Sequence, residues 1–265
     1  MIGFMPVRLD YALEKKALLV RALYEIFEEE AQKFGFICQP GCADCCTVNL
    51  LATSAEARFL LQALSEETRQ ELRERLKALR GHPRLRPKIT PNEMATLCLS
   101  GKEPPEEEGY TLESCPFLDE QALCRIYQWR PFACRSFFSL KRCREVGEAV
   151  IPPEFLSLTT TFMQLLEEAD LAGLYGNFFD LLDYLLEREE RLKQGGEDPA
   201  VPDYLLSNRE APDFAIPPEH ERYVRGVLAK LYRRPIGETT FKGLLDEVKE
   251  GAQVKEALSF LGEAL

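Results

Sequence analysis

Apolar residues recur every three or four positions along most of this chain, which is the spacing of amphipathic helices. The pattern predicts a first helix over residues 10–34, with Asp10 as its N-cap. Thr53 and Glu56 have the spacing of a capping box, which predicts a short second helix. Ser65 can cap a third helix. The first part of the chain is therefore expected to be mostly helical.

The same periodicity returns in the second half of the chain. It predicts helices over residues 157–172 and 177–193 and another helix after Pro218. A helical pair is expected to follow a cap at Thr239 or Thr240 and to reach Leu265. The hydrophobic pattern thus favours helices at both ends of the chain.

Strand-like alternation is rare. Only residues 47–51 and 110–112 are predicted to be extended, and Gly173 and Gly176 are interpreted as a turn between two helices. The predicted fold class is therefore mainly α: a helical protein with an irregular, loop-rich cysteine module that binds metal.

The cysteines divide the chain into three predicted regions. We expect residues 1–36 to form an N-terminal helix that packs on the module, residues 37–147 to form the cysteine-cluster metal-binding module, and residues 148–265 to form a C-terminal helical region. All nine cysteines fall in the middle region. Such clustering is typical of ligation rather than of thiols scattered through a core.

Composition and charge exclude several functional classes. The chain has 265 residues, 45% of them apolar, and a formal net charge of −11. This charge argues against a general binder of nucleic acid or of anionic membranes, because phosphate binding needs clustered positive charge. No apolar run of about 18 residues and no signal-peptide pattern occur, so we expect a cytoplasmic protein without a membrane span. Cytoplasmic thiols stay reduced, which makes disulfides the weaker explanation for the cysteines.

The first group of cysteines comprises Cys38, Cys42, Cys45 and Cys46. Gaps of two or three residues let one turn of backbone bring several sulfurs to one centre, and thiolates favour zinc or iron–sulfur clusters. Neighbouring side chains in an extended segment point to opposite sides, so Cys45 and Cys46 do not readily bind one ion. Either they face two centres, or one of them lies beside a centre and hydrogen-bonds to it.

The second group comprises Cys115, Cys124, Cys134 and Cys143. The eight cysteines of both groups are predicted metal ligands. They suffice for two four-sulfur sites, or for one four-cysteine cluster with four thiols left for other tasks. Inert buried thiols and a disulfide switch are less favoured alternatives. Cys98 stands apart and is interpreted as a small buried hydrophobic residue.

A basic segment accompanies the second group. Residues 121–144 carry six basic side chains and no acidic one. Arg125, Arg130 and Arg135 are predicted to bind the cofactor, because cations lower thiol pKa values and offset the negative charge of four thiolates. The segment would also suit an anionic small-molecule or protein partner, and a solvated basic face is the plain alternative.

Four short motifs occur in order: Cys-x3-Cys-x2-Cys-Cys from Cys38, Cys-Pro-Phe-Leu from Cys115, Cys-x-Ile-Tyr from Cys124, and Arg-Pro-x-x-Cys-Arg-x-Phe from Arg130. With these motifs the chain resembles the YkgJ-type cysteine-cluster family, a zinc- or iron-chelating domain. The resemblance implies metal binding at seven of the eight clustered cysteines, and the motifs do not specify the eighth, Cys143. A relative type, the bacterial flagellin lysine N-methylase, combines a similar module with an iron–sulfur cluster and S-adenosylmethionine, so the resemblance also implies methyl transfer as an activity to test.

A competing pattern is that of radical S-adenosylmethionine enzymes. They share the spacing of Cys38, Cys42 and Cys45, and the triplet Gly195-Gly196-Glu197 resembles one of their cofactor-contacting motifs. Those enzymes are built from repeated strand–helix units, and the alternating pattern of such units is missing here. This interpretation is therefore disfavoured.

The predicted function is metal binding through clustered cysteines. An iron–sulfur cluster of the 4Fe–4S type is preferred over zinc, with a cluster-dependent redox or methyl-transfer enzyme as the activity in view. The alternative is a structural-zinc interaction or metal-handling module without catalysis. No catalytic residue is predicted, because neither His82 nor His220 suits a catalytic base.

Overall fold

The computed structural model describes the backbone of residues 7–263 and the side chains of residues 12–253. Its regular structure is mainly α-helical, which confirms the mainly α part of the predicted fold class. Within the described residues the helices are α1 Val7–Ala31, α2 Ser54–Ala63, α3 Glu66–Leu79, α4 Pro91–Leu99, α5 Phe132–Ser136, α6 Cys143–Val146, α7 Pro153–Ala169, α8 Phe178–Lys193, α9 Glu221–Tyr232 and α10 Phe241–Glu263. The short elements are β1 Leu51–Thr53, β2 Leu174–Asn177, β3 Leu206–Ser207, β4 Pro235–Ile236, β5 Thr239–Thr240 and the 3-10 turn η1 Tyr127–Trp129.

The predicted helix starts in the first part of the chain are mostly confirmed. The Thr53 side chain accepts a hydrogen bond from the Glu56 N–H, and Glu56 in turn accepts one from the Thr53 N–H, which completes the capping box of α2. The Ser65 hydroxyl accepts a hydrogen bond from the Thr68 N–H and caps α3. The first helix begins at Val7, so Asp10 lies inside it rather than at its cap.

The turn predicted around Gly173 and Gly176 is wrong. Residues Leu174–Asn177 form β2, the central strand of an antiparallel three-stranded sheet of order β1-β2-β3. A Cβ at Gly176 would lie 2.6 Å from the Leu205 side chain, so glycine there permits close packing. A four-residue strand with a central glycine carries too little alternation to be recognised from its pattern.

The structure also differs from the prediction in the last helices of the chain. A single helix, α10, replaces the helical pair expected after Thr239, and Leu265 lies outside the described residues. Thr239 and Thr240 form β5, which pairs with β4. The Thr240 hydroxyl accepts a hydrogen bond from the Gly243 N–H (3.2 Å) in the first turn of α10, so Thr240 caps this helix as one of the two predicted alternatives.

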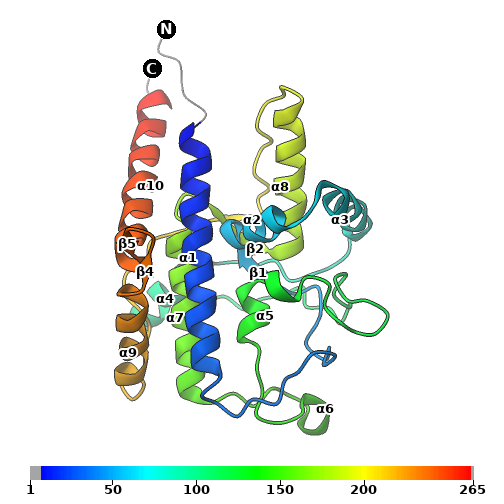
Figure 1. Cartoon of the computed structure of the whole chain (residues 1–265), viewed down its shortest axis with the longest axis vertical. Helices are drawn as coiled ribbons and strands as arrows, with labels where there is room; N and C mark the ends of the chain where they lie inside the picture. The colour runs from blue at the N-terminus through cyan, green and yellow to red at the C-terminus, as the bar shows by residue number, and fades with distance from the viewer. Residues whose placement is uncertain (1–6, 264–265) are drawn as a thin grey trace.

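Two apolar clusters hold the described part of the chain together. The first lies among α1, α7, α9 and α10, and α1, α7 and α10 run side by side in Figure 1. In it the Phe27 ring packs at 5.0 Å from Phe155 and at 5.4 Å from Phe162. The second cluster lies among β1, α2, α3 and α8 and includes side chains of the cysteine-rich segments. None of the helices described is long and apolar enough to cross a membrane.

Candidate metal centre

The first and second cysteine-rich segments meet through their backbones. The Cys115 N–H donates a hydrogen bond of 3.0 Å to the Cys46 carbonyl oxygen. Thr47 forms an antiparallel bridge with Ser114, next to this hydrogen bond. Residues predicted to be extended after Cys46 therefore pair with the chain that leads into Cys115.

A tight hairpin then brings Cys124 back beside the segment that follows Cys115. Leu118 and Cys124 form an antiparallel bridge. The Asp119 carboxylate accepts hydrogen bonds from the backbone N–H groups of Gln121 (2.9 Å) and Leu123 (2.8 Å), which closes the turn. The loop between Cys115 and Cys124 is thus closed by an Asx-type turn at Asp119.

Helix α5, which carries Cys134, is anchored by a buried glutamate. Glu56 accepts hydrogen bonds from the Phe132 N–H (2.7 Å) and from the Tyr24 hydroxyl (2.8 Å), in addition to its role in the cap of α2. Burial raises the pKa of Glu56, and these hydrogen bonds act against that rise. The capping pattern identified Glu56, but its second role depends on contacts far apart in the sequence.

Four cysteines come together in the second apolar cluster. Cys115 is a buried member of this cluster, and three half-buried cysteines pack against it. We call them the inner cysteine group: Cys46, Cys115, Cys124 and Cys134.

The surroundings of the inner cysteine group are apolar. Phe117 and Ile126 are buried in the same cluster, and Trp129 packs against it. Burial raises the pKa of the Cys115 thiol to about 11. Burial also raises the pKa of Cys134, and the neighbouring Cys115 adds to this effect. Without a metal these thiols are therefore held as neutral side chains.

The other four of the eight predicted ligands lie outside both apolar clusters. We call them the outer cysteine group: Cys38, Cys42, Cys45 and Cys143. The first three are exposed and Cys143 is half-buried. Burial is the main cause of a raised pKa at Cys38, and the charges of the other three members contribute further. Cys42, Cys45 and Cys143 therefore each lie within electrostatic range of Cys38.

The two groups meet at the adjacent pair Cys45 and Cys46. The Cys45 thiol donates a hydrogen bond to the Cys46 sulfur, which raises the pKa of Cys45 and lowers that of Cys46. Cys46 interacts with the three other members of the inner group, whereas Cys45 is among the groups that act on Cys38.

All nine cysteines are free thiols. Among the residues that the structure describes, no three His, Cys, Asp or Glu side chains are spaced to bind one metal ion. Four soft thiol donors from three segments, gathered in an apolar setting, nevertheless have the chemistry that an iron or zinc centre needs.

The three arginines predicted to bind a cofactor have different surroundings. Arg130 stacks over the Tyr127 ring at 3.8 Å and lowers the pKa values of Cys124 and Cys134 through its charge. Its Nε is buried and has no hydrogen-bond partner. A thiolate or sulfide acceptor at the inner group would suit this unpartnered donor.

Arg135 and Arg125 are placed differently. Arg135 is buried, donates to the Arg130 carbonyl oxygen at 2.8 Å, and pairs with Glu28. Its guanidinium also lies over the Tyr24 ring at 4.2 Å. Arg125 is exposed. Their predicted cofactor contacts stay predictions.

The expectation that Cys98 is buried is wrong. Cys98 lies exposed in the last turn of α4, and the buried residues of this helix are Asn92 and Ala95 in its first turns. The helix packs on α7 and then extends past it into solvent, which leaves Cys98 uncovered.

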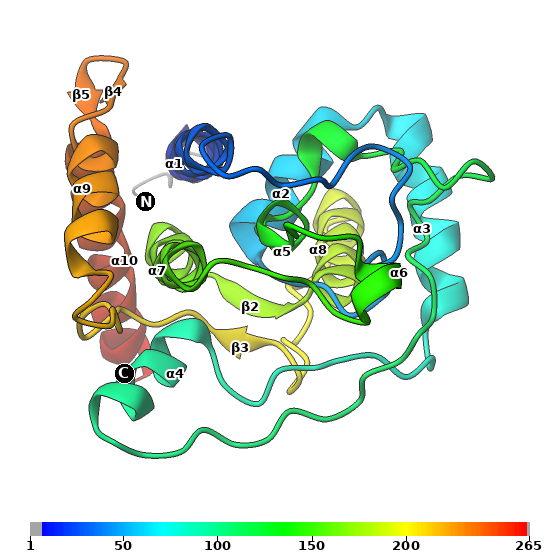
Figure 2. The same ribbon diagram turned by 90° about the horizontal axis from the view of Figure 1, so that it is seen from below.

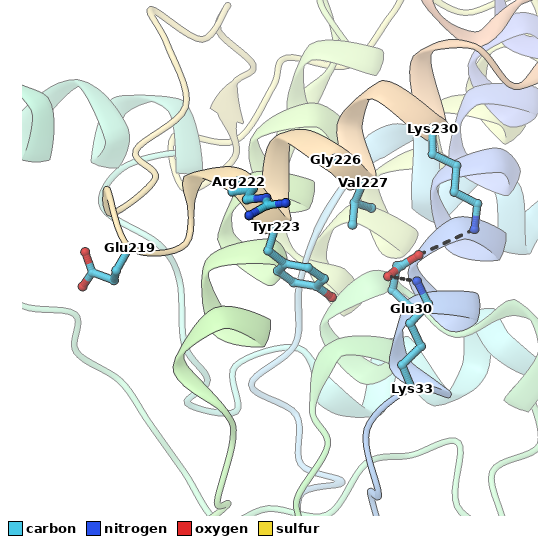
Figure 3. A pocket seen from close by; sticks show the side chains of 8 residues that line it. All are labelled: Glu30, Lys33, Glu219, Arg222, Tyr223, Gly226, Val227 and Lys230. Atoms are coloured by element: carbon cyan, nitrogen blue, oxygen red, sulfur yellow. Dashed lines mark hydrogen bonds and ion pairs between the residues drawn. The ribbon is translucent and has the colours of Figure 1, made fainter.

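An open pocket of about 560 Å³ lies away from the cysteines, between the end of α1 and α9 (Figure 3). Glu30 is buried in its wall and pairs with Lys33 at 2.5 Å and with Lys230 at 3.6 Å. The Tyr223 ring lines the same pocket, and its hydroxyl has no partner. The carboxylate already has two cationic partners, and no cysteine lines the pocket.

Comparison with known proteins agrees with the cysteine chemistry. Residues 37–150 match the CxxCxxCC family model, described as "Putative zinc- or iron-chelating domain". The match covers both cysteine groups and confirms the resemblance to a cysteine-cluster family. No curated protein and no solved structure matches the chain.

Proposed function

We propose, from the match of residues 37–150 to a zinc- or iron-chelating domain, that the protein is a metal-binding protein with its principal centre at the inner cysteine group. The single observation that carries this proposal is the packing of Cys46, Cys115, Cys124 and Cys134 around one apolar cluster. Four thiolates complete the coordination of a four-cysteine centre.

An iron–sulfur cluster of the 4Fe–4S type suits this group better than zinc. The Arg130 charge acts on the Cys124 and Cys134 thiols. This cation and the adjacent pair Cys45 and Cys46 suit a multinuclear centre with a net negative charge. These two features support the cluster.

The protein's own residues would serve the centre in three ways. The side chains of Phe117, Ile126 and Trp129 exclude water from the inner group. Arg130 offsets part of the negative charge and presents its unpartnered Nε. A bound cluster would supply a one-electron centre, whose potential depends on these surroundings. Four cysteine ligands leave no open metal position, so we favour electron transfer or a structural role over methyl transfer with S-adenosylmethionine.

Anaerobic purification followed by elemental analysis and absorption spectroscopy tests the proposal. We expect iron and sulfide with a visible absorption band, and loss of both in Cys124→Ser. Cys98→Ser is the matched control, because Cys98 is exposed on α4 and belongs to neither group. A colourless protein with one zinc per inner group would show a structural zinc module instead. Equal metal loss in both variants would contradict the assignment of the inner group.

A further inference from the structure

An exposed extended segment joins α4 to the second group of cysteine motifs. Residues 100–114 follow α4 and run along the outer boundary of the molecule in Figure 2. Two large apolar side chains of this segment, Tyr110 and Leu112, are 66% and 95% exposed, more than any other large apolar side chain that the structure describes. The segment carries no cysteine, so the proposed function gives these two side chains no role.

One edge of this segment is held in place by hydrogen bonds. The Asn49 side chain donates to the Thr111 carbonyl oxygen at 2.6 Å and accepts from the Thr111 N–H at 3.3 Å. The Glu113 carbonyl oxygen accepts from the Val48 N–H at 3.1 Å. In an extended strand the N–H and the C=O of one residue point to the same side. The Asn49 amide therefore takes the place of a neighbouring strand at Thr111.

Both ends of the segment are also anchored. Gly109 has the left-handed conformation, with φ +86°, and a Cβ there would lie 3.0 Å from the Arg84 carbonyl oxygen. Glycine thus lets the chain turn and lie against the residues that follow α3. At the other end, Ser114 forms an antiparallel bridge with Thr47. The segment is therefore fixed in an extended shape without any contact at its outer edge.

The outer edge of the segment has unused backbone groups. Successive residues of a strand direct their N–H and C=O groups to opposite edges. The groups of Thr111 and Glu113 point toward Asn49 and Val48, so those of Tyr110 and Leu112 point outward. Neither Tyr110 nor Leu112 forms a hydrogen bond within the described part of the chain. Their side chains, two positions apart, share one face of the segment.

The charge around this edge is acidic. Residues 102–113 contain five glutamates and one lysine. Glu107 and Glu108 contact Lys88, whereas Glu103 and Glu106 form no ion pair among the described residues. A second copy of the chain, paired edge to edge about a two-fold axis, would bring these like charges together. The charge therefore favours a basic partner over a second copy.

We propose that residues 109–113 form a docking edge for an extended, basic segment of another protein, which adds to this edge as a β-strand. The main chain of that segment pairs with the free N–H and C=O groups of Tyr110 and Leu112, and its apolar side chains pack beside theirs. Its lysines or arginines lie near the glutamates of residues 103–108. This inference goes beyond the proposed function and does not depend on a metal at the cysteines.

Peptide titration of the full-length, anaerobically purified protein tests the docking edge. The probe is a fluorescently labelled peptide of alternating lysine and valine. A peptide of alternating glutamate and valine controls for charge. A lysine–valine peptide methylated on every second backbone nitrogen keeps the side chains and loses the hydrogen-bond donors of one edge. We expect only the first peptide to raise the anisotropy, and we expect it to slow amide hydrogen exchange at Tyr110 and Leu112 but not at Thr111.

A variant removes the apolar contact without disturbing the fold. Leu112→Ser should weaken binding of the lysine–valine peptide by about tenfold or more, because the apolar area that leucine buries against the peptide is lost. Its 95% exposure means that it contributes little to the core. Leu192→Ser is the matched control, since Leu192 is an exposed leucine on α8, and it should bind the peptide as the parent does.

Several results would overturn the docking edge. They are absence of binding by the lysine–valine peptide, equal binding of the methylated peptide, and undiminished binding by Leu112→Ser. Preference for the glutamate–valine peptide would contradict the basic partner. A dimer in sedimentation analysis that Leu112→Ser dissociates would show that a second copy covers this edge instead.

Discussion

The inner and outer cysteine groups contain the same number of the same side chain, yet they lie in different physical environments. The inner thiols pack on an apolar cluster shared with β1, α2 and α8, and Cys115 is only 8% exposed. The outer thiols lie on loops, and three of them are exposed. A cysteine motif therefore identifies only the donor atoms. The burial of those atoms decides whether a metal bound to them would stabilise the fold or exchange with solvent.

The largest expected difference between the groups is in stability. Cys115→Ala should lower the free energy of unfolding of the metal-loaded protein by several kcal/mol, since structural zinc in small domains contributes about 10–16 kcal/mol of binding free energy. Cys42→Ala should change it by less than about 1 kcal/mol, because Cys42 is exposed. Denaturant unfolding of both variants under reducing, anaerobic conditions measures the contrast. Equal destabilisation would remove the distinction between the groups.

A smaller effect is expected from the anchor of the inner group. Glu56→Ala leaves the buried Phe132 N–H without its acceptor and removes half of the α2 capping box. The loss should be about 3 kcal/mol, since an unsatisfied buried donor costs about 1–3 kcal/mol and a cap about 1 kcal/mol.

The same variant should loosen α5, and with it Cys134. We expect faster metal release from the inner group of Glu56→Ala than from that of the parent. Chelator-release kinetics measure the difference. Glu29→Ala is a matched control, because Glu29 lies on the exposed face of α1. Equal release rates in Glu56→Ala and Glu29→Ala would contradict the anchoring role.

The last expected effect is on the pH dependence of the free energy of unfolding, and it lies away from both groups, at Glu167. Burial raises its pKa to about 7 from an ordinary value of 4.5, although Glu167 accepts hydrogen bonds from the N–H groups of Asn92 (2.8 Å) and Arg209 (2.7 Å). The folded state binds the proton more tightly than the unfolded state does. The stabilising contribution is therefore complete below pH 4.5 and is lost as the pH rises through 7.

This pH dependence should amount to about 3.5 kcal/mol, at about 1.4 kcal/mol per pKa unit over the rise from 4.5 to about 7. Glu167→Gln should flatten the decline of the unfolding free energy between pH 4.5 and pH 7 and leave the metal content of both groups unchanged. Urea unfolding at several pH values measures the slope. An unaltered slope in the variant would show that other groups cause the decline.

Local signals in the sequence predicted those elements that local interactions determine. The capping box of Thr53 and Glu56 and the cap at Ser65 are confirmed, because a cap is made by residues three positions apart. Strand β2 was missed, because its hydrogen-bond partners are in β1 and β3, far away along the chain. Cys98 was misplaced for the same reason, since its exposure depends on where α4 leaves α7.

For the candidate site, the residue types were readable but their grouping was not. The motifs identified eight cysteines, and the family match to residues 37–150 agrees with them. Their spacing along the chain suggested one group before residue 47 and another after residue 114. The structure instead groups Cys46 with the later segment and Cys143 with the earlier one. Pairing of Cys46 with Cys115 and of Ile37 with Ser139 crosses that boundary.

The sequence by itself determined the mainly helical fold class and the donor atoms of the site, because helical periodicity and thiol chemistry are properties of residues close together in the chain. Only the tertiary structure decided which thiols share an environment, how deeply they are buried and which arginine lies beside them. Burial and long-range hydrogen bonds arise when distant segments pack, and they set the dielectric surroundings of each sulfur. For this protein, that packing distinguishes a group of thiols on an apolar cluster from a more exposed one.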